Sequence, residues 1–475
     1  MPRHRRAVGW TTTLFGAAVS MAAIASCSDQ SAPVPTTPSA PVADRAAATG
    51  DHHRGMERLE HVVVIYLENH SFDNLYGDFP GADGRPDQPR FPQVDASGQP
   101  YDSLPVVAGS PFPTNLPNAP FAIEQYVPAT VAPPDLVHRF YQEQMQIDNG
   151  RMDQFALVSD VKGESMGYYH TANLPLAAEA RRYTLCDHFF HAAFGGSFLN
   201  HVWLIAARTP VFPNAPASVV AVLDSTGKLV TDGFVTPDGY DVNTSFTVNT
   251  PHPASTPVAN LVPNQTFATI GDRLSDRGIS WAWYSGGWND ALAGHPGTLF
   301  QFHHQPFAYF ANYADGTRGK AEHLKDESDF LAAAQAGTLP AVAFVKPYGS
   351  DNEHPGYTDV IGGELHTEQL INAVRNGPQW EHTAIIITYD EHGGYWDHVR
   401  PPRVDRWGPG SRVPTLVIAP FARRGEVDHR RYDTTSILAL IERRWHLEPL
   451  TSRDASADPL SGAFDFGEHW ARFDR

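Results

Sequence analysis

Two segments far apart in the chain place acidic and amide side chains directly after apolar runs. The first, HVVVIYLENHSFDN, spans residues 61–74, and the second, AIIITYDEHGGYWDHV, spans residues 384–399. Both apolar runs are rich in β-branched residues, which predicts buried strands. In parallel sheets, chemistry takes place at the carboxyl ends of the strands. Two such strands in one sheet would therefore bring their polar ends together.

Four of these polar side chains are suited to holding a metal ion, namely Glu68, Asn69, Asp390 and Glu391. Carboxylate and amide oxygens are the hard ligands that divalent cations prefer. A single strand that ends in a carboxylate is also compatible with a simple solvated turn. Two such ends favour a metal-binding or catalytic site.

Two further motifs contain residues that could take part in catalysis or binding. In AAFGGSFLNHVW, residues 192–203, two glycines precede Ser197 and a helix-like run follows it. A hydroxyl there can bind an anion or act as a nucleophile beside a cation, although capping the helix is the commoner role. In GSDNEHPG, residues 349–356, His354 follows a third predicted strand and could equally be a surface turn residue.

The N-terminal residues have the features of an export signal. Arginines are followed by an apolar stretch and by Ile24-Ala25-Ser26-Cys27, which predicts a signal peptide over residues 1–26. The pattern resembles the bacterial lipobox, in which the cysteine is lipidated; simple cleavage near Ala25 is the alternative. The Arg5-Arg6 pair leaves both the general secretory route and the twin-arginine route open. Residues 27–55 are rich in Ser, Pro, Thr and Ala and are expected to form a flexible tether.

The composition excludes some partners. The chain of 475 residues has 35 basic and 53 acidic residues, and an acidic surface argues against nucleic acid. Small phosphate esters stay possible because local groups can meet their charge. If Cys27 is lipidated, Cys186 is unpaired, and its apolar surroundings predict a buried, inert thiol. The oligomeric state is not indicated.

The remaining chain, residues 56–475, alternates between predicted strands and helices. This order indicates an α/β fold with a mostly parallel sheet and helices on both faces. Residues 210–263 interrupt it and are expected to be an inserted β-rich region. The predicted helices cover residues 136–158, 196–207, a segment near Asp272, 322–337, 364–376 and 434–445. Further strands are predicted over residues 279–285, 341–347 and 415–421.

Taken together, four motifs resemble the bacterial phosphoesterase family, which contains acid phosphatases and non-specific phospholipases C. They are ENHSFDNLYG, FGGSFLNH, SDNEHPG and YDEHGGYWDHV, in this order. The resemblance extends from Leu59 to the C-terminus. It implies the fold of the alkaline phosphatase superfamily, a three-layer α/β/α sandwich.

The resemblance also implies roles for individual residues. Glu68, Asn69, Asp390 and Glu391 match the ligands of one divalent metal ion of unknown identity. Ser197 matches the nucleophile, at a position where phospholipases C of this family tend to carry Thr. His354 and His138 match histidines that contact the phosphoryl group, and the surroundings of His138 resemble the acid phosphatase branch. His70 stands where many members have Arg.

We therefore expect metal-dependent hydrolysis of phosphate esters through Ser197, with phosphomonoesters as substrates of an acid phosphatase. The first alternative is a phospholipase C that releases phosphorylated headgroups from phospholipids. The second is a catalytically inactive lipoprotein that binds ligands or sugars. Lipidated Cys27 would hold the protein at the cell envelope; a periplasmic or secreted protein is the alternative.

Lipidation of Cys27 predicts that the Cys27→Ser variant loses its attachment to membranes. A diacyl anchor supplies two chains, each stabilised by about 0.8 kcal/mol per buried methylene, which is enough for stable attachment. Fractionation of cells that express the wild type and the variant measures this. Wild-type protein that fractionates as freely soluble would refute the lipobox and favour simple signal cleavage.

Overall fold

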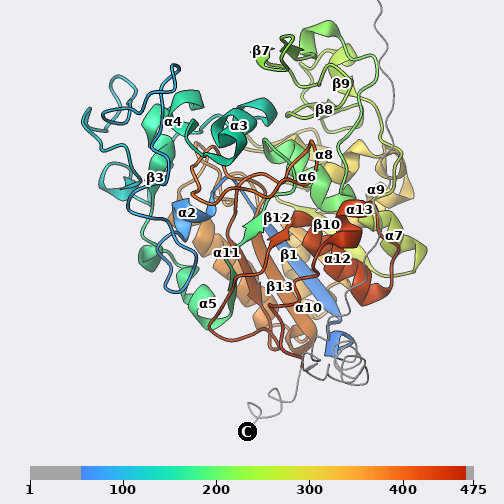
Figure 1. The fold of residues 1–475 in the computed structure, drawn as a ribbon. Helices are drawn as coiled ribbons and strands as arrows, with labels where there is room; N and C mark the ends of the chain where they lie inside the picture. The colour runs from blue at the N-terminus through green and yellow to red at the C-terminus, as the bar shows by residue number, and fades with distance from the viewer. Residues whose placement is uncertain (1–54, 467–475) are drawn as a thin grey trace, which may run out of the picture. The chain divides into compact units, whose positions relative to one another are not determined.

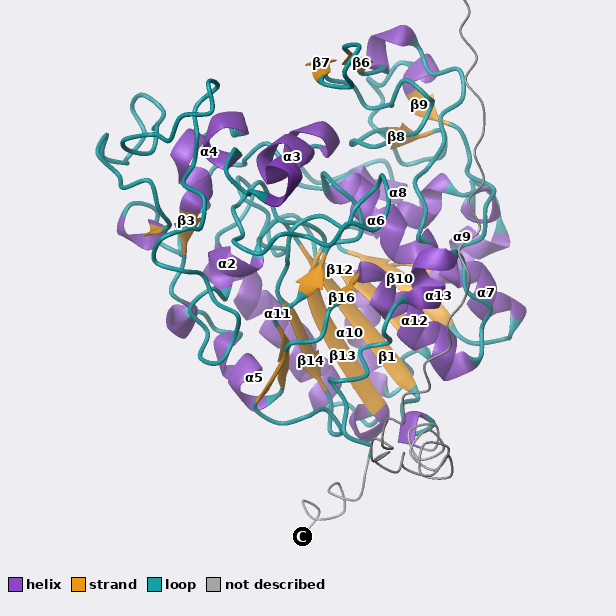
Figure 2. Cartoon of the chain, in the orientation of Figure 1, coloured by secondary structure: helices purple, strands orange, loops and turns teal. Residues whose placement is uncertain are grey.

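An eight-stranded sheet forms the centre of the fold, in the order β11-β10-β12-β1-β13-β14-β4-β15 (Figure 1, Figure 2). The computed structural model describes residues 55–466. The predicted signal peptide, Cys27 and all but the last residue of the tether lie outside the described residues. β14 runs antiparallel to β13 and β4, and the other neighbouring pairs are parallel. The predicted α/β fold with a mostly parallel sheet is confirmed.

The strands of this sheet are β1 (His61–Leu67), β4 (Thr184–Cys186), β10 (Trp281–Ser285), β11 (Leu324–Asp326), β12 (Val342–Lys346), β13 (Thr383–Tyr389), β14 (Thr415–Ile418) and β15 (Glu426–Asp428). β1 and β13 are neighbours, and Leu67 pairs with Tyr389 at their ends. Every residue of β13 is buried, as is usual for a parallel strand covered on both faces. The two predicted polar turns therefore start at the same edge of the sheet.

Helices cover both faces of the sheet. Three connections run across the sheet toward β15, and they contain α5 (Ala177–Arg182), α10 (Glu327–Ala336) and α11 (Val360–Arg375). The connection from β4 to β10 runs back toward β11 and contains α6 (Ser197–Ala206) and α7 (Ile270–Asp276). Right-handed crossovers put these two groups on opposite faces. α12 (Thr434–Trp445) packs against α6. The longest described helix, α11, has 16 residues, and none of the described helices is long and apolar enough to cross a membrane.

The smaller elements are the helices α2 (Phe72–Leu75), α3 (Phe140–Ile147), α4 (Phe155–Val158), α8 (Trp288–Leu292), α9 (Arg318–His323) and α13 (Ser452–Ser456), and the strands β2 (Phe121–Ala122), β3 (Gly167–Tyr168), β5 (Phe189–Phe190), β6 (Val222–Leu223), β7 (Leu229–Thr231), β8 (Phe246–Thr247), β9 (Leu261–Val262) and β16 (Tyr432–Asp433). β6 to β9 are the strands of the predicted inserted region. They form two small two-stranded sheets, and most of residues 210–263 is loop.

Some predicted elements differ in extent. The helix expected over 136–158 is two helices, because Asp148 and Asn149 adopt left-handed backbone angles after α3. The helix expected over 322–337 starts later, because Asp326 caps α10 and belongs to β11. Cys186 is a buried free cysteine, as predicted.

A buried arginine joins the two polar turns. The Nε of Arg412 donates a hydrogen bond to Asp397 (2.9 Å), and one of its terminal nitrogens donates to Asp73 (3.0 Å). All three side chains are almost fully buried. Asp73 lies after β1 and Asp397 lies after β13, so one cation fixes both turns at the edge of the sheet.

Replacing Arg412 with Met should destabilise the protein strongly, because it removes the counter-charge of the buried Asp397 and leaves Asp73 with His398 as its remaining partner. Loss of one partner of a buried ion pair costs about 3–5 kcal/mol. The matched control is Arg406→Met, because Arg406 pairs with Asp238 with about half of each side chain exposed and such pairs contribute about 0–1 kcal/mol. Urea unfolding of both variants measures the difference; equal stabilities would contradict the assigned role of Arg412.

Candidate active site

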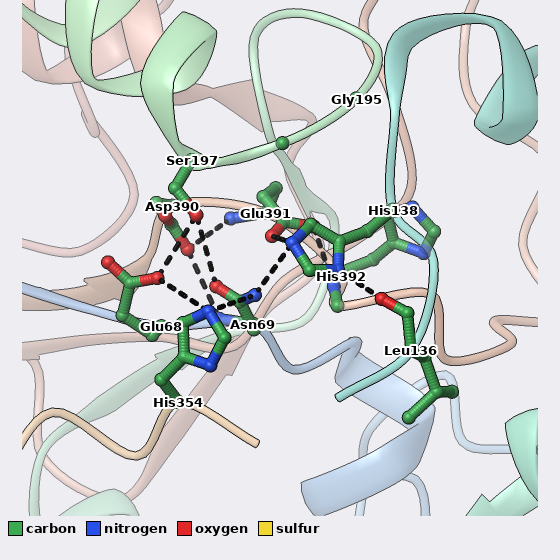
Figure 3. A network of polar contacts seen from close by, with 12 residues as sticks. Glu68, Asn69, Leu136, His138, Gly195, Ser197, His354, Asp390, Glu391 and His392 are labelled. Carbon is green, nitrogen blue, oxygen red and sulfur yellow. Dashed lines mark hydrogen bonds and ion pairs between the residues drawn. The ribbon is translucent and has the colours of Figure 1, made fainter. Parts of the chain in front are cut away.

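Ser197 lies at the start of α6, directly opposite the end of β1 (Figure 3). Its hydroxyl donates to Glu68 Oε2 at 3.0 Å and lies 3.4 Å from Asn69 Oδ1. Gly196 occupies the N-cap position, and no side chain caps this helix. The capping role that the sequence allowed for Ser197 is therefore wrong. Its side chain points into the polar site instead.

Asn69 connects the serine to two histidines. Its side-chain Nδ2 lies 3.2 Å from His138 Nε2 and 3.3 Å from His354 Nε2. Its backbone N–H donates to Asp390 Oδ1 at 3.1 Å. The backbone of Asn69 is left-handed, with φ of 66°, a conformation that asparagine tolerates better than most residues. That turn is what directs its amide between the serine and the histidines.

Both histidines present the same ring nitrogen to the site. The Nδ1 atom of His138 bonds to the Leu136 carbonyl, and the Nδ1 atom of His354 bonds to the Pro355 carbonyl at 2.5 Å. A carbonyl only accepts hydrogen bonds, so each Nδ1 carries a hydrogen and each Nε2 is the ring nitrogen that faces Asn69. Burial lowers the pKa of His354.

The carboxylates of Glu68, Asp390 and Glu391 are fully buried. Asp390 Oδ2 and Glu391 Oε1 accept no hydrogen bond within the described part of the chain. Burial, followed by the charge of Glu68, raises the pKa of Asp390 to about 8, and burial together with Asp390 raises the pKa of Glu391. Unpartnered buried oxygens with this excess of negative charge are the donor set that a divalent cation requires, so the residues fit a metal ion.

The structure brings the predicted residues together with one difference in detail. Glu391 contacts other residues of the site: its Oε2 accepts from the Gly393 N–H at 2.6 Å, and its Oε1 lies 3.7 Å from His138 Nε2. Glu68 instead forms a tight group with His201 and His304, whose ligand atoms and carboxylate oxygen lie within 4.8 Å of one another.

Three residues of this site were not predicted from the sequence. Lys346 forms a buried ion pair with Glu68 Oε1, and His304 Nε2 lies 2.8 Å from the same oxygen. Burial would raise the pKa of Glu68, but Lys346 and His304 outweigh it and hold the pKa well below its ordinary value. The third, His201, bonds through Nδ1 to the Ser197 carbonyl (2.7 Å).

Each of these residues had a signal in the sequence. Lys346 is a charged residue within an apolar strand, His304 belongs to the pair in QFHHQPF, and His201 lies one helical turn after Ser197. His70, by contrast, bonds to Asn74 Oδ1 (2.6 Å) and to the Glu353 carbonyl (3.1 Å). Its hydrogen bonds therefore hold the turn after β1 and do not reach Ser197.

The buried Ser197 thus lies beside three buried carboxylates at the carboxyl end of a mostly parallel sheet, which is where α/β folds carry their chemistry. The sequence profile of the Phosphoesterase family matches residues 59–448. The chain belongs to this family, which places it among the phosphoric ester hydrolases.

The chain is also similar to individual known proteins. The chain is 26% identical over 459 residues to a non-hemolytic phospholipase C of Pseudomonas aeruginosa, covering 87% of this chain and 58% of that protein. It is 25% identical over 468 residues to phospholipase C A of Mycobacterium tuberculosis, covering 90% and 81% of the two chains. A solved alkaline phosphatase superfamily protein from Vibrio parahaemolyticus matches with 10% identity and a TM-score of 0.35, covering 70% and 73%.

Metal content tests the ligand assignment. Asp390→Asn and Glu68→Gln should each weaken binding of a divalent cation at least about tenfold, because even residues behind the ligands change affinity by about 10–100-fold. Elemental analysis of the purified proteins, before and after dialysis against chelator, measures the bound metal. Asp241→Asn is the matched control, since Asp241 is a fully buried acid that bonds to Ser245. Full occupancy in Asp390→Asn would remove Asp390 from the ligand set.

Proposed function

We propose that this protein hydrolyses phosphate esters through a phosphoserine at Ser197, with one divalent cation held by Glu68, Asn69, Asp390 and Glu391. The observation that carries the proposal is the position of the Ser197 hydroxyl, which bonds to Glu68 and faces Asn69. Phosphomonoesters are the preferred substrates.

Ser197 Oγ attacks phosphorus as its hydroxyl proton passes to Glu68 Oε2, and the bond from phosphorus to the leaving oxygen breaks. Glu68 accepts the hydroxyl hydrogen in the resting state and so fixes the direction of the Oγ lone pairs. When bound, the cation offsets charge on the phosphoryl oxygens and favours ionisation of the serine. His138 or His354 donates the proton that the leaving oxygen requires. Water then attacks phosphorus and gives a proton back to that histidine, while Glu68 returns its proton to Ser197 Oγ. The bond from Oγ to phosphorus breaks, which releases phosphate and restores Ser197.

The donors opposite Ser197 favour a phosphomonoester. Such a substrate has three non-bridging oxygens, whereas a phosphodiester has two. Asn69 Nδ2 and the two histidine Nε2 atoms lie together on one side of the site, and each can donate a hydrogen bond once the histidines are protonated. A serine nucleophile and the surroundings of His138 also favour the acid phosphatase branch.

A phospholipase C is the second candidate, because the relatives described above carry that name. Lipidation at Cys27 would bring either type of enzyme close to a membrane. The two candidates differ in substrate, so hydrolysis itself discriminates between them.

The Ser197→Ala variant should fold normally and lose at least about a thousandfold in kcat, because the covalent step needs the hydroxyl. Acid quenching of the wild type during turnover should trap phosphate on Ser197, which peptide mass spectrometry detects. Wild-type activity in Ser197→Ala would refute the nucleophile.

The same assay decides between substrates and between the histidines. Wild type is compared on p-nitrophenyl phosphate, nucleotides, an alkyl phosphate and phosphatidylcholine vesicles; preference for the vesicles would favour the phospholipase. His138→Asn and His354→Asn are compared on p-nitrophenyl and alkyl phosphates. The variant that loses the general acid should lose more rate on the alkyl ester, whose leaving group needs the proton. Equal losses on both esters would exclude both residues as the acid.

A further inference from the structure

A second buried charge cluster lies beside the active site. It consists of Glu143 on α3, His191 and His392, all fully buried. Glu143 Oε1 lies 2.9 Å from His191 Nε2 and 3.6 Å from His392 Nε2, and the two imidazole rings stack with their centroids 5.5 Å apart. The proposed mechanism uses none of the three residues.

The carboxylate of Glu143 is held by backbone donors on both oxygens. Oε2 accepts from the Gly195 N–H at 2.6 Å, and Oε1 accepts from the Ser411 N–H at 2.9 Å. Burial would raise the pKa of Glu143, but the charges of His191 and His392 and these hydrogen bonds lower it to about 2. The ionised carboxylate of Glu143 is therefore bonded to Gly195, which precedes the proposed nucleophile Ser197 by two residues.

The loop that carries Ser197 has little room to move. Gly195 has φ of +90°, and a Cβ there would lie 2.5 Å from the Phe140 nitrogen. A Cβ on Gly196 would lie 3.0 Å from the His138 carbonyl oxygen. The side chain of Asn200 closes the loop by donating to the Gly195 carbonyl at 3.1 Å. The position of Ser197 thus depends on contacts with the segment that also carries His138.

His392 connects the same carboxylate to the acidic turn after β13. It follows Glu391 directly, and its Nδ1 bonds to the Tyr395 carbonyl at 3.1 Å, which directs Nε2 toward Glu143. Gly195 and His392 border the proposed site from two different segments (Figure 3). Glu143 therefore lies between the loop that carries the nucleophile and the turn that carries two proposed metal ligands.

We propose that Glu143 is a positioning residue that fixes Ser197 relative to the turn containing Asp390 and Glu391. The proposal rests on the proposed function, since it assigns Glu143 to the attack by Ser197. Glu143 does not act as an acid or base here, because its oxygens are occupied by backbone N–H groups and histidines. Small errors in the position of a nucleophile reduce the rate of the chemical step more than they reduce substrate binding.

The test is Glu143→Gln in the full-length enzyme. An amide can accept with only one of its two terminal atoms, so the variant must lose the bond to either Gly195 or Ser411 whichever way it turns. We expect kcat to fall about 10–100-fold, because a displacement of about 1 Å costs about that much, with KM changed less than about threefold and metal content unchanged.

Glu327→Gln is the matched control, because Glu327 forms a similar pair with His366 (2.8 Å) on α10 and α11. It should keep the wild-type kcat. Wild-type kcat in Glu143→Gln, an equal loss in the control, or loss of bound metal together with activity would each overturn the proposal. Ser197→Ala separates the two hypotheses. If Ser197→Ala is inactive while Glu143→Gln is fully active, only the positioning role of Glu143 is refuted. If Ser197→Ala is fully active, the assignment of Ser197 as the nucleophile is refuted.

A second measurement uses the wild type alone, so it tests the proposal even if Glu143→Gln does not fold. Hydrogen exchange of the wild type, resolved at Gly195, should show an amide as strongly protected as those of β1, because its acceptor is a buried carboxylate. Exchange of the Gly195 amide as fast as that of exposed loops would overturn the proposal.

Discussion

The structure depends on negative charge that is buried where β1 and β13 end. Glu68 and Asp390 follow paired strands, and Glu391 follows at once. Unpaired buried charges cost several kcal/mol each. Lys346 compensates Glu68, whereas burial raises the pKa values of Asp390 and Glu391, and one oxygen of each accepts no hydrogen bond from residues 55–466. Under the proposed function, a divalent cation would complete the balance of charge at this site, and the surrounding residues would keep its ligands in place.

The turn after β13 is held near both of its ends by contacts with buried charged side chains. His392 faces Glu143 near its start, and Asp397 pairs with Arg412 near its end. Between them, Gly393 lies so close to the turn after β1 that a Cβ would come within 2.0 Å of the Asn69 carbonyl oxygen. The two turns are packed directly against each other, so the positions of Asn69 and of the acidic pair are not independent.

Much of this arrangement could be predicted from the sequence because it follows from local patterns. The apolar runs of β1 and β13 predict strands, and strand ends predict where Glu68 and Asp390 meet. The pattern could not decide whether Ser197 caps a helix, since Gly196 takes that position only in the folded loop. Lys346 pairs with Glu68 across 278 positions of the chain, and no local periodicity encodes such a partner. The extent of α3 was overestimated because backbone turns at Asp148 and Asn149 interrupt an otherwise helical pattern.

The balance of charge also explains why two histidines would suit a phosphomonoester under the proposed assignment. The three buried carboxylates carry three negative charges when ionised, and Lys346 with one divalent cation offsets all of them. His304 adds nothing, because burial lowers its pKa to about 4. A phosphomonoester dianion would then bring two negative charges into a neutral site. Burial lowers the pKa of His354, but a bound dianion favours the protonated form of a neighbouring histidine, so protonated His138 and His354 would balance both charges. A phosphodiester would bring one charge and would leave one protonated histidine without a counter-charge, so the proposed assignment favours the dianion.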